Sequence, residues 1–132
     1  MLFSHACQYA MQAVLYLARQ QSDSYVSIKE IAEKNNISFH FLVKILQKLT
    51  QQGILISYKG PKGGVSLAKP ADQITPLEIV DAIDGLSFCN MCILGMPGCD
   101  EHHPCDLHHK WSRIREEIYE MLSEKSIAEL ID

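Results

Sequence analysis

The feature that most constrains the fold is the segment 59–64, Lys-Gly-Pro-Lys-Gly-Gly, which stands between two short β-prone runs, 54–58 and 65–68. Glycine and proline at this density turn the chain, so the two runs predict a β-hairpin. The glycines leave the backbone open to close approach, and the lysines bring positive charge to the tip. The hairpin is therefore suited to lie along the phosphate backbone of a nucleic acid.

Two helices are predicted directly before this hairpin. The first covers about 27–34, where Ser27 and Glu30 form a capping pattern. The second covers 38–52, with Ser38 as its cap, and its leucines and isoleucines recur at spacings of three and four, which indicates one buried face. A short helix, a tight turn and a longer helix with a polar outer face are typical of a helix-turn-helix motif. The basic hairpin extends the prediction to a winged helix, a mainly α fold with one small β-hairpin.

The candidate DNA-binding residues are polar, basic or glycine positions of the second helix and the hairpin. They are Ser38, His40, Lys44, Gln47, Lys48, Lys59, Gly60, Lys62, Gly63 and Gly64. The net charge of −4 does not argue against DNA, because the charge is spread unevenly. Residues 1–72 hold eight Lys and Arg against four Asp and Glu, whereas residues 73–132 hold four against twelve. The first half can neutralise phosphates while the acidic half faces elsewhere.

Two further helices are predicted in the second half of the chain. The first follows a cap at Thr75 with Pro76 behind it, and it ends near Gly85. The second covers 106–124 and carries apolar residues at alternating spacings of four and three. These are Leu107, Trp111, Ile114, Ile118 and Met121. Such a heptad seam suits pairing with a second copy of the chain, so a homodimer is expected; docking on the chain's own domain is the alternative.

Four of the five cysteines crowd into an irregular stretch between these helices. They are Cys89, Cys92, Cys99 and Cys105. Clustering of this kind is typical of metal sites rather than of disulfide frameworks. Spacing alone allows a tetrahedral zinc site formed by Cys89, Cys92, Cys105 and His108, and a metal-free thiol switch is a further alternative. Cys7 falls on the apolar face of a predicted N-terminal helix and is interpreted as a core residue.

Several segments, in this order and spacing, carry a family resemblance. They are 3–10 (Phe-Ser-His-Ala-Cys-Gln-Tyr-Ala), 31–32, 37–38, 49–53, the hairpin 58–64, 78–85 (Glu-Ile-Val-Asp-Ala-Ile-Asp-Gly), the cysteine stretch and 126–130. With these segments the chain resembles the IscR, NsrR and CymR family of bacterial winged-helix transcriptional regulators. The resemblance covers nearly the whole sequence. It implies a homodimer that reads a roughly palindromic operator in double-stranded DNA.

The resemblance also implies a set of metal ligands. In the branch of the family that binds an iron–sulfur cluster, the ligands correspond here to Cys92, Cys99, Cys105 and His108, which implies a 2Fe-2S cluster held by three thiolates and one imidazole. The first gap between these cysteines is one residue longer than in that branch. Gln8 stands where some relatives have an acidic ligand.

Other classes of protein are less compatible with the sequence. It contains no nucleophile with a neighbouring base and no phosphate-binding loop, so an enzyme is not expected. No apolar run approaches the about 18 residues of a membrane helix and no signal-peptide pattern is present, so we expect a cytoplasmic protein without membrane contact. A zinc-stabilised interaction module would not need a basic wing.

The predicted organisation is a DNA-binding domain at 1–85, a cysteine-rich sensor loop at 86–105, and a dimerisation helix with a C-terminal segment at 106–132. The predicted function is that of a transcriptional regulator, most simply a repressor, whose operator affinity is controlled by an iron–sulfur cluster. A winged-helix regulator with structural zinc or a thiol switch is the alternative.

Overall fold

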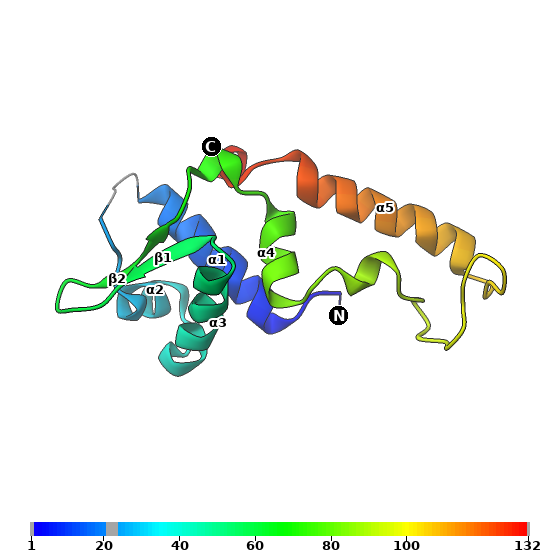
Figure 1. Cartoon of the computed structure of the whole chain (residues 1–132), viewed down its shortest axis with the longest axis horizontal. Helices are drawn as coiled ribbons and strands as arrows, with labels where there is room; N and C mark the ends of the chain where they lie inside the picture. The colour runs from blue at the N-terminus through cyan, green and yellow to red at the C-terminus, as the bar shows by residue number, and fades with distance from the viewer. Residues whose placement is uncertain (1, 21–23, 132) are drawn as a thin grey trace.

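The structure is a computed structural model that describes residues 2–20 and 24–131. Its elements in chain order are α1 (His5–Arg19), α2 (Ile28–Asn35), α3 (Phe39–Gln51), β1 (Leu55–Tyr58), β2 (Gly64–Leu67), the 3-10 helix η1 (Ala71–Gln73), α4 (Pro76–Ile83), the 3-10 helix η2 (Ser87–Cys89), α5 (His108–Glu124) and α6 (Ile127–Leu130). The predicted winged helix-turn-helix architecture is confirmed (Figure 1). No helix in the described ranges combines the length and apolar character that crossing a membrane requires.

The helix-turn-helix is formed by α2 and α3. Ser27 caps α2 by accepting a hydrogen bond from the N–H of Glu30 at 3.1 Å. Asn36 ends α2 in the left-handed conformation, with φ at 54°, which asparagine adopts more readily than most residues. Ser38 is the N-cap residue of α3, but its side chain makes no capping hydrogen bond, so that part of the prediction is wrong. The exposed Ser38 hydroxyl is therefore not committed to the end of the helix.

The wing is an antiparallel pair of strands in which Leu55 lies opposite Leu67 and Tyr58 opposite Gly64. Val26, which precedes α2, forms a single antiparallel bridge to β2, in which its N–H and C=O both bond to Val65 at 2.9 Å. A side chain on Gly64 would place its Cβ 2.1 Å from the carbonyl oxygen of Val26. This glycine is thus required by the chain's own backbone, and the expected approach to phosphate is not needed to explain it.

The main core lies between α1, α3, α4 and the wing. Its largest buried side chains come from every one of these elements, and they include Val14, Leu42, Leu46, Val65 and Ile79. The short α6 returns to this core, where Ile127 is fully buried and its N–H donates to the carbonyl of Ile74 at 2.8 Å. Both ends of the segment 86–126 are therefore attached to the same body.

A second, smaller apolar cluster joins α1, α4, η2 and α5. Cys7, Val80, Phe88 and Leu122 are buried in it, and the rings of Phe3 and Phe88 meet edge to face at 5.7 Å. Cys7 is 2% exposed, as expected for a core residue. The stretch after Gly85 is predicted to be irregular; instead, 87–89 forms a 3-10 turn, because burial of Phe88 fixes the start of the loop.

Helix α5 projects from the core as an arm, and the cysteine loop lies at its far end, opposite the wing (Figure 1). The heptad residues on α5 do not share one environment. Trp111 is buried and Ile118 packs into the second cluster, whereas Leu107, Ile114 and Met121 are exposed. Part of the predicted seam therefore packs on the chain itself, and the exposed residues, seven apart, form a narrower apolar stripe on the outside.

Candidate DNA interface and cysteine site

The candidate DNA interface, called the reading head below, consists of the outer face of α3 and the hairpin 58–64. The leucine and isoleucine positions of α3 are buried, so its polar positions are turned outward. The predicted DNA contacts that are exposed are Ser38, His40, Lys44, Gln47, Lys48, Lys59, Gly60 and Lys62, whereas Gly63 and Gly64 are half-buried. The helix and hairpin thus present one set of short polar, basic and backbone groups.

Aromatic side chains flank this surface, and the sequence patterns did not single them out. Phe39 and Phe41 are exposed at the start of α3, and the ring of Phe41 meets that of Tyr9 edge to face at 5.7 Å. On the wing, Tyr58 lies 5.4 Å from Tyr25, ring centre to ring centre. Phe39 and Phe41 are apolar residues on the outer face of an amphipathic helix. That mismatch is the signal that could have identified them as part of this surface.

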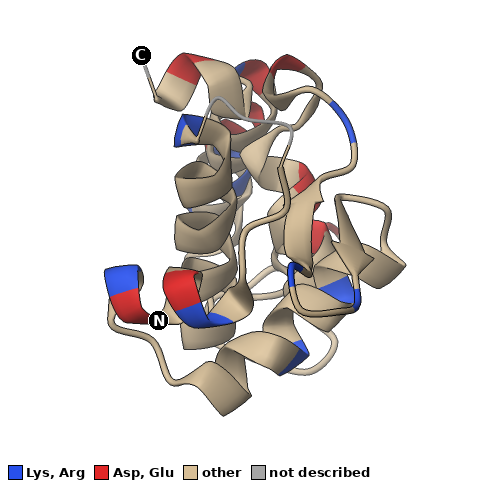
Figure 2. Cartoon of the chain, turned by 90° about the vertical axis from the view of Figure 1, so that its left-hand side faces the viewer, with Lys and Arg blue, Asp and Glu red and all other residues tan. Residues whose placement is uncertain are grey.

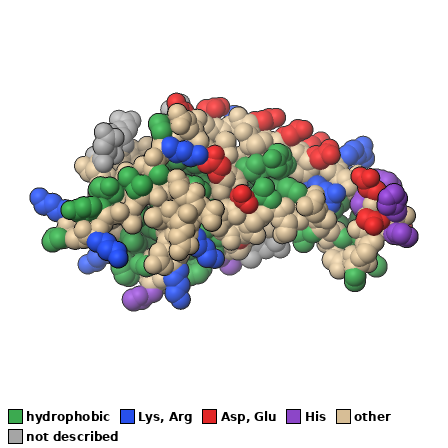
Figure 3. All heavy atoms as spheres, in the orientation of Figure 1, with side chains coloured by type: hydrophobic (Ala, Val, Ile, Leu, Met, Phe, Trp, Pro, Cys, Tyr) green, Lys and Arg blue, Asp and Glu red, His purple; other side chains and the backbone are tan. Residues whose placement is uncertain are grey.

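The uneven charge along the sequence becomes an uneven charge in space. Seen from the wing side, Lys and Arg lie on the hairpin and on the helices beside it (Figure 2). In the space-filling view, basic side chains gather over the wing and neighbouring helices, while acidic side chains run along α5 (Figure 3). A negatively charged polymer is therefore attracted to the wing end and repelled by the arm.

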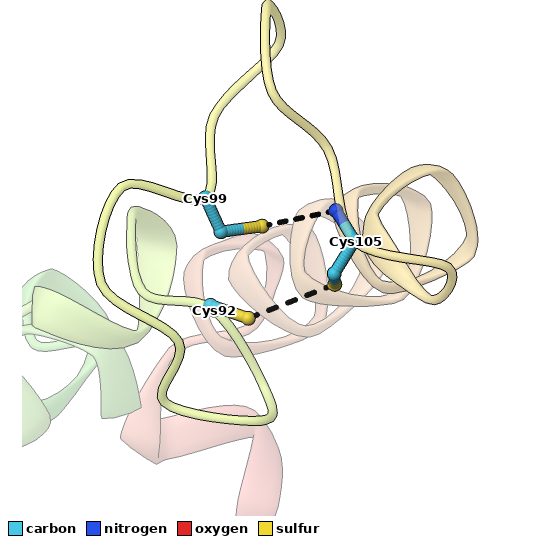
Figure 4. Close-up of side chains that lie close together, drawn as sticks. All are labelled: Cys92, Cys99 and Cys105. Carbon is cyan, nitrogen blue, oxygen red and sulfur yellow. Dashed lines mark hydrogen bonds between the residues drawn. The ribbon is translucent and has the colours of Figure 1, made fainter.

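Three of the loop cysteines converge beside the start of α5. The Sγ atoms of Cys92, Cys99 and Cys105 all lie within 4.8 Å of one another, and those of Cys92 and Cys105 are 3.7 Å apart. The side chains of Cys92 and Cys99 both point toward Cys105, whose N–H donates to the Cys99 sulfur at 3.4 Å (Figure 4). Thiols gathered in this way form a donor set for a soft metal ion or a cluster.

His108 lies next to one of these thiols. Its Nδ1 lies 3.5 Å from the Sγ of Cys99, and the residue is 7% exposed although it is the first of α5. Cys89 is not a member of the three-thiol group; it lines a separate depression with Arg115 and Tyr119 of α5. The geometry thus groups Cys92, Cys99 and Cys105, with His108 beside Cys99, and it does not group the zinc pattern that begins at Cys89.

Electrostatics differ between the thiols of the group. Hydrogen bonds from the backbone N–H groups of Met96 and Leu94, together with those from the neighbouring thiols, lower the pKa of Cys92 to about 7. The N–H of Cys105 favours the Cys99 thiolate, but burial and the adjacent sulfurs of Cys105 and Cys92 outweigh it and raise the pKa of Cys99. A first thiolate therefore forms readily in the metal-free site, and a second is suppressed by like charge.

Side chains of helix α5 also hold the cysteine loop, through a backbone carbonyl of the loop. The indole Nε1–H of Trp111 donates to the carbonyl oxygen of Met91 at 2.8 Å, and an N–H of the Arg115 guanidinium donates to the same oxygen at 3.1 Å. The heptad spacing predicts Trp111 in the dimer seam. Its position three residues after His108, on the same helical face, is the signal that could have linked it to the cysteine site.

Comparison with known proteins assigns the chain to a family. A model of the Rrf2 family, described as "Iron-dependent Transcriptional regulator", matches residues 3–132. The chain belongs to the Rrf2 family. A protein of Aquifex aeolicus named among the HTH-type transcriptional regulators is 37% identical over 100% of this chain and 92% of its own length.

Further relatives agree with the assignment to the Rrf2 family. The HTH-type transcriptional regulator IscR of Erwinia tasmaniensis is 30% identical over 95% of this chain and 76% of its own. The solved structure of CymR, the global cysteine regulator of B. subtilis, superposes with a TM-score of 0.83 at 25% identity, over 98% of this chain and 95% of that one. The chain is thus a DNA-binding transcriptional regulator of the Rrf2 family, similar to IscR and CymR, and not an enzyme.

Proposed function

We propose that this Rrf2-family regulator controls its operator affinity through an iron–sulfur cluster held by Cys92, Cys99, Cys105 and His108. The observation that carries the proposal is the convergence of three sulfur atoms within 4.8 Å, with the imidazole of His108 next to Cys99. The family description as iron-dependent and the likeness to IscR support the choice of iron.

The donor chemistry fits a 2Fe-2S cluster. Three thiols and one imidazole supply the four ligands that such a cluster needs, and the low pKa of Cys92 provides a thiolate near neutral pH. When bound, the cluster supplies a redox centre whose potential the histidine raises. The chain's own contribution is to bring the donors together and to keep His108 buried beside them.

Both parts of the reading head, α3 and the wing, contact the operator. Ser38, His40, Lys44, Gln47 and Lys48 of α3 lie in the major groove, while the wing residues Lys59, Gly60, Lys62, Gly63 and Gly64 follow the phosphate backbone. The exposure of most of these side chains and their basic surroundings support this assignment. A DNA operator as partner places the protein in the cytoplasm.

Pairing of two chains through the helix within 106–124 completes the unit. The apolar stripe of Leu107, Ile114 and Met121, spaced by seven residues on the outside of α5, supports a helix-to-helix contact. In this arrangement 1–85 reads DNA, 86–105 senses and 106–132 dimerises, with α6 packed back on the reading unit. Occupancy or redox state of the cluster alters the loop beside α5, which changes the angle between two reading heads whose half-sites lie about one helical turn apart; repression is the expected output.

Anaerobic purification with metal, sulfide and absorption analysis tests the cluster. We expect a coloured protein with about two iron and two sulfide per chain, as a 2Fe-2S cluster requires. Cys92→Ser abolishes the cluster, whereas the matched control Cys89→Ser keeps it, because Cys89 lies outside the thiol group. A colourless protein with one zinc, lost in both variants, would establish the zinc alternative. A metal-free protein with reversible disulfides would establish the thiol switch.

Salt titration of operator binding tests the wing. Each lost phosphate contact reduces the salt slope of the binding constant by about 1. Lys59→Ala is therefore expected to weaken binding and to flatten the slope, while Lys125→Ala, at the end of the acidic α5, leaves both unchanged. Equal behaviour of the two variants would remove the wing from the interface.

A further inference from the structure

The carbonyl oxygen of Met91, the residue directly before Cys92, receives two hydrogen bonds from α5. Trp111 donates its indole N–H at 2.8 Å and Arg115 a guanidinium N–H at 3.1 Å. Trp111 is only 7% exposed, so its N–H needs a protein partner, and it finds that partner on the loop rather than in its own helix. A double contact on one loop carbonyl is a specific feature of this site.

One helical face carries both the donors and a candidate ligand. His108, Trp111 and Arg115 are separated by three and four residues, so their side chains project from the same side of α5. Cys105 precedes this face, and its carbonyl accepts the N–H of His108 at 3.1 Å. The start of α5 therefore positions Cys105 and His108 through the covalent chain, but it can reach Cys92 only through side-chain contacts.

Within the loop, Cys92 is held by a local turn: the Gly95 N–H donates to the Cys92 carbonyl at 3.0 Å, and backbone N–H groups of Leu94 and Met96 bond to its sulfur. These contacts do not fix the turn relative to α5. The neighbouring residues Met91, Ile93 and Leu94 are all about half exposed.

The Met91 N–H donates to the carbonyl of Ser87 at 3.0 Å, so η2 holds one side of this residue and α5 holds the other. The Met91 carbonyl and the nitrogen of Cys92 belong to the same planar peptide group. Fixing the Met91 oxygen therefore fixes the orientation of that group and the position of the Cys92 Cα.

We propose that Trp111 and Arg115 are positioning residues that hold Cys92 beside Cys99, Cys105 and His108 before any metal or cluster binds. The identity of the bound group rests on the proposed function, but the positioning does not. It predicts that the metal-free thiol group is already assembled, and that loss of either donor lets Cys92 move away. Trp111→Phe removes the N–H and keeps a buried ring, and Arg115→Gln removes the guanidinium.

Disulfide formation in the metal-free protein measures the approach of Cys92 to Cys105. Diamide takes two electrons and two protons from the two thiols; an S–S bond forms, and the N=N bond of diamide becomes a hydrazine. The rate of formation, with the disulfide mapped by peptide mass spectrometry, is expected to fall by about two- to tenfold in each variant, the range set by one hydrogen bond. It falls further in the double variant. Arg115→Lys, which keeps a long side chain with a positively charged N–H donor, restores part of the rate, and Arg113→Gln on the same helix serves as the matched control.

Cobalt titration of the metal-free protein under anaerobic conditions is the second readout. Because Co²⁺ absorbs visibly when thiolates bind it, its affinity is read directly, and loss of an outer hydrogen-bonding partner is expected to weaken it by about tenfold or more. Unchanged oxidation rate and unchanged Co²⁺ affinity in the double variant would overturn the proposal. If the wild-type chain binds no iron cluster but the variants still lose disulfide formation, the positioning holds and only the proposed function fails.

Far-UV circular dichroism and melting temperature establish that each variant is folded. Should Trp111→Phe fail to fold, Arg115→Gln carries the test, because Arg115 is only partly buried and its removal leaves the apolar packing of α5 in place. A folded Arg115→Gln with wild-type oxidation rate and wild-type Co²⁺ affinity would also count against the proposal.

Discussion

Replacement of Gly64 by alanine tests whether the wing is held by its own backbone contacts. The added Cβ would lie 2.1 Å from the carbonyl oxygen of Val26, 2.4 Å from its carbonyl carbon and 2.8 Å from the nitrogen of Ser27. All three are backbone atoms and cannot rotate away as a side chain can. The wing must therefore move off Val26.

That movement has a cost that can be worked out from the structure. It breaks both hydrogen bonds between Val26 and Val65, each 2.9 Å long, and a net loss of about 1 kcal/mol is typical for each. The side chain of Val65, now buried, loses part of an apolar burial worth about 1.5–3 kcal/mol. We expect Gly64→Ala to reduce the free energy of unfolding by about 3 kcal/mol, a large part of the ~5–15 kcal/mol typical of small domains.

Urea unfolding followed by far-UV circular dichroism, without DNA, measures this change. Gly53→Ala is the matched control, because Gly53 has φ at 79° but no atom within 4 Å of the added Cβ. It is expected to lose only the about 1–2 kcal/mol that a left-handed conformation costs alanine. Operator binding falls in Gly64→Ala as well. If Gly64→Ala is no less stable than Gly53→Ala, the steric reasoning is refuted.

Three further predictions concern thiols and the outer stripe of α5. In the metal-free protein, alkylation of Cys92 by iodoacetamide should reach half its maximal rate near pH 7 and precede that of Cys99; a shared midpoint would contradict the electrostatic argument. Burial, reinforced by the charge of Asp84, raises the pKa of Cys7 to about 11, so the unfolded thiol ionises first. Wild-type stability, measured against Cys7→Ala in urea, should therefore be intact below about pH 9 and fall between pH 9 and 11, and a pH-independent difference would sink this reasoning. Met121→Glu should convert a dimer to a monomer in sedimentation without changing the fold, because Met121 is 61% exposed, whereas Glu120→Gln should not.

The parts of the fold that follow local rules could be predicted from the sequence. The 3.6-residue period of Val14 and Leu17, or of Leu42 and Leu46, is a property of a single helix, and so is the cap at Ser27. The hairpin is just as local, since its turn residues stand next to its strands. Each of these signals lies within a dozen residues of the structure that it indicates.

The parts that depend on distant contacts could not be predicted in the same way. Burial of Phe88 requires Phe3, far away in the chain, and Ile127 is buried because it meets Ile74. No local pattern distinguishes Trp111, which turns inward, from Ile114, which stays exposed on the same seam. The convergence of Cys92 with Cys105 was expected from resemblance, but the contact that holds the Met91 carbonyl was not, because a backbone acceptor has no sequence signature.

The attachment of α5 at its C-terminal end has a mechanical consequence. With 17 residues the helix is about 25 Å long. Leu122 and, just after the helix, Ile127 of α6 are buried and fix its C-terminal end, while the thiols lie at its N-terminal end. For a rod of this length, a displacement of about 2 Å at the tip, the size of helix shifts in switching proteins, corresponds to a rotation of only about 5° at the fixed end. In a single chain, a displacement at the cysteine site therefore becomes only a small rotation at the DNA surface. A larger effect on DNA binding requires a second α5 helix packed against the first, so that two small rotations add and change the distance between the two wings.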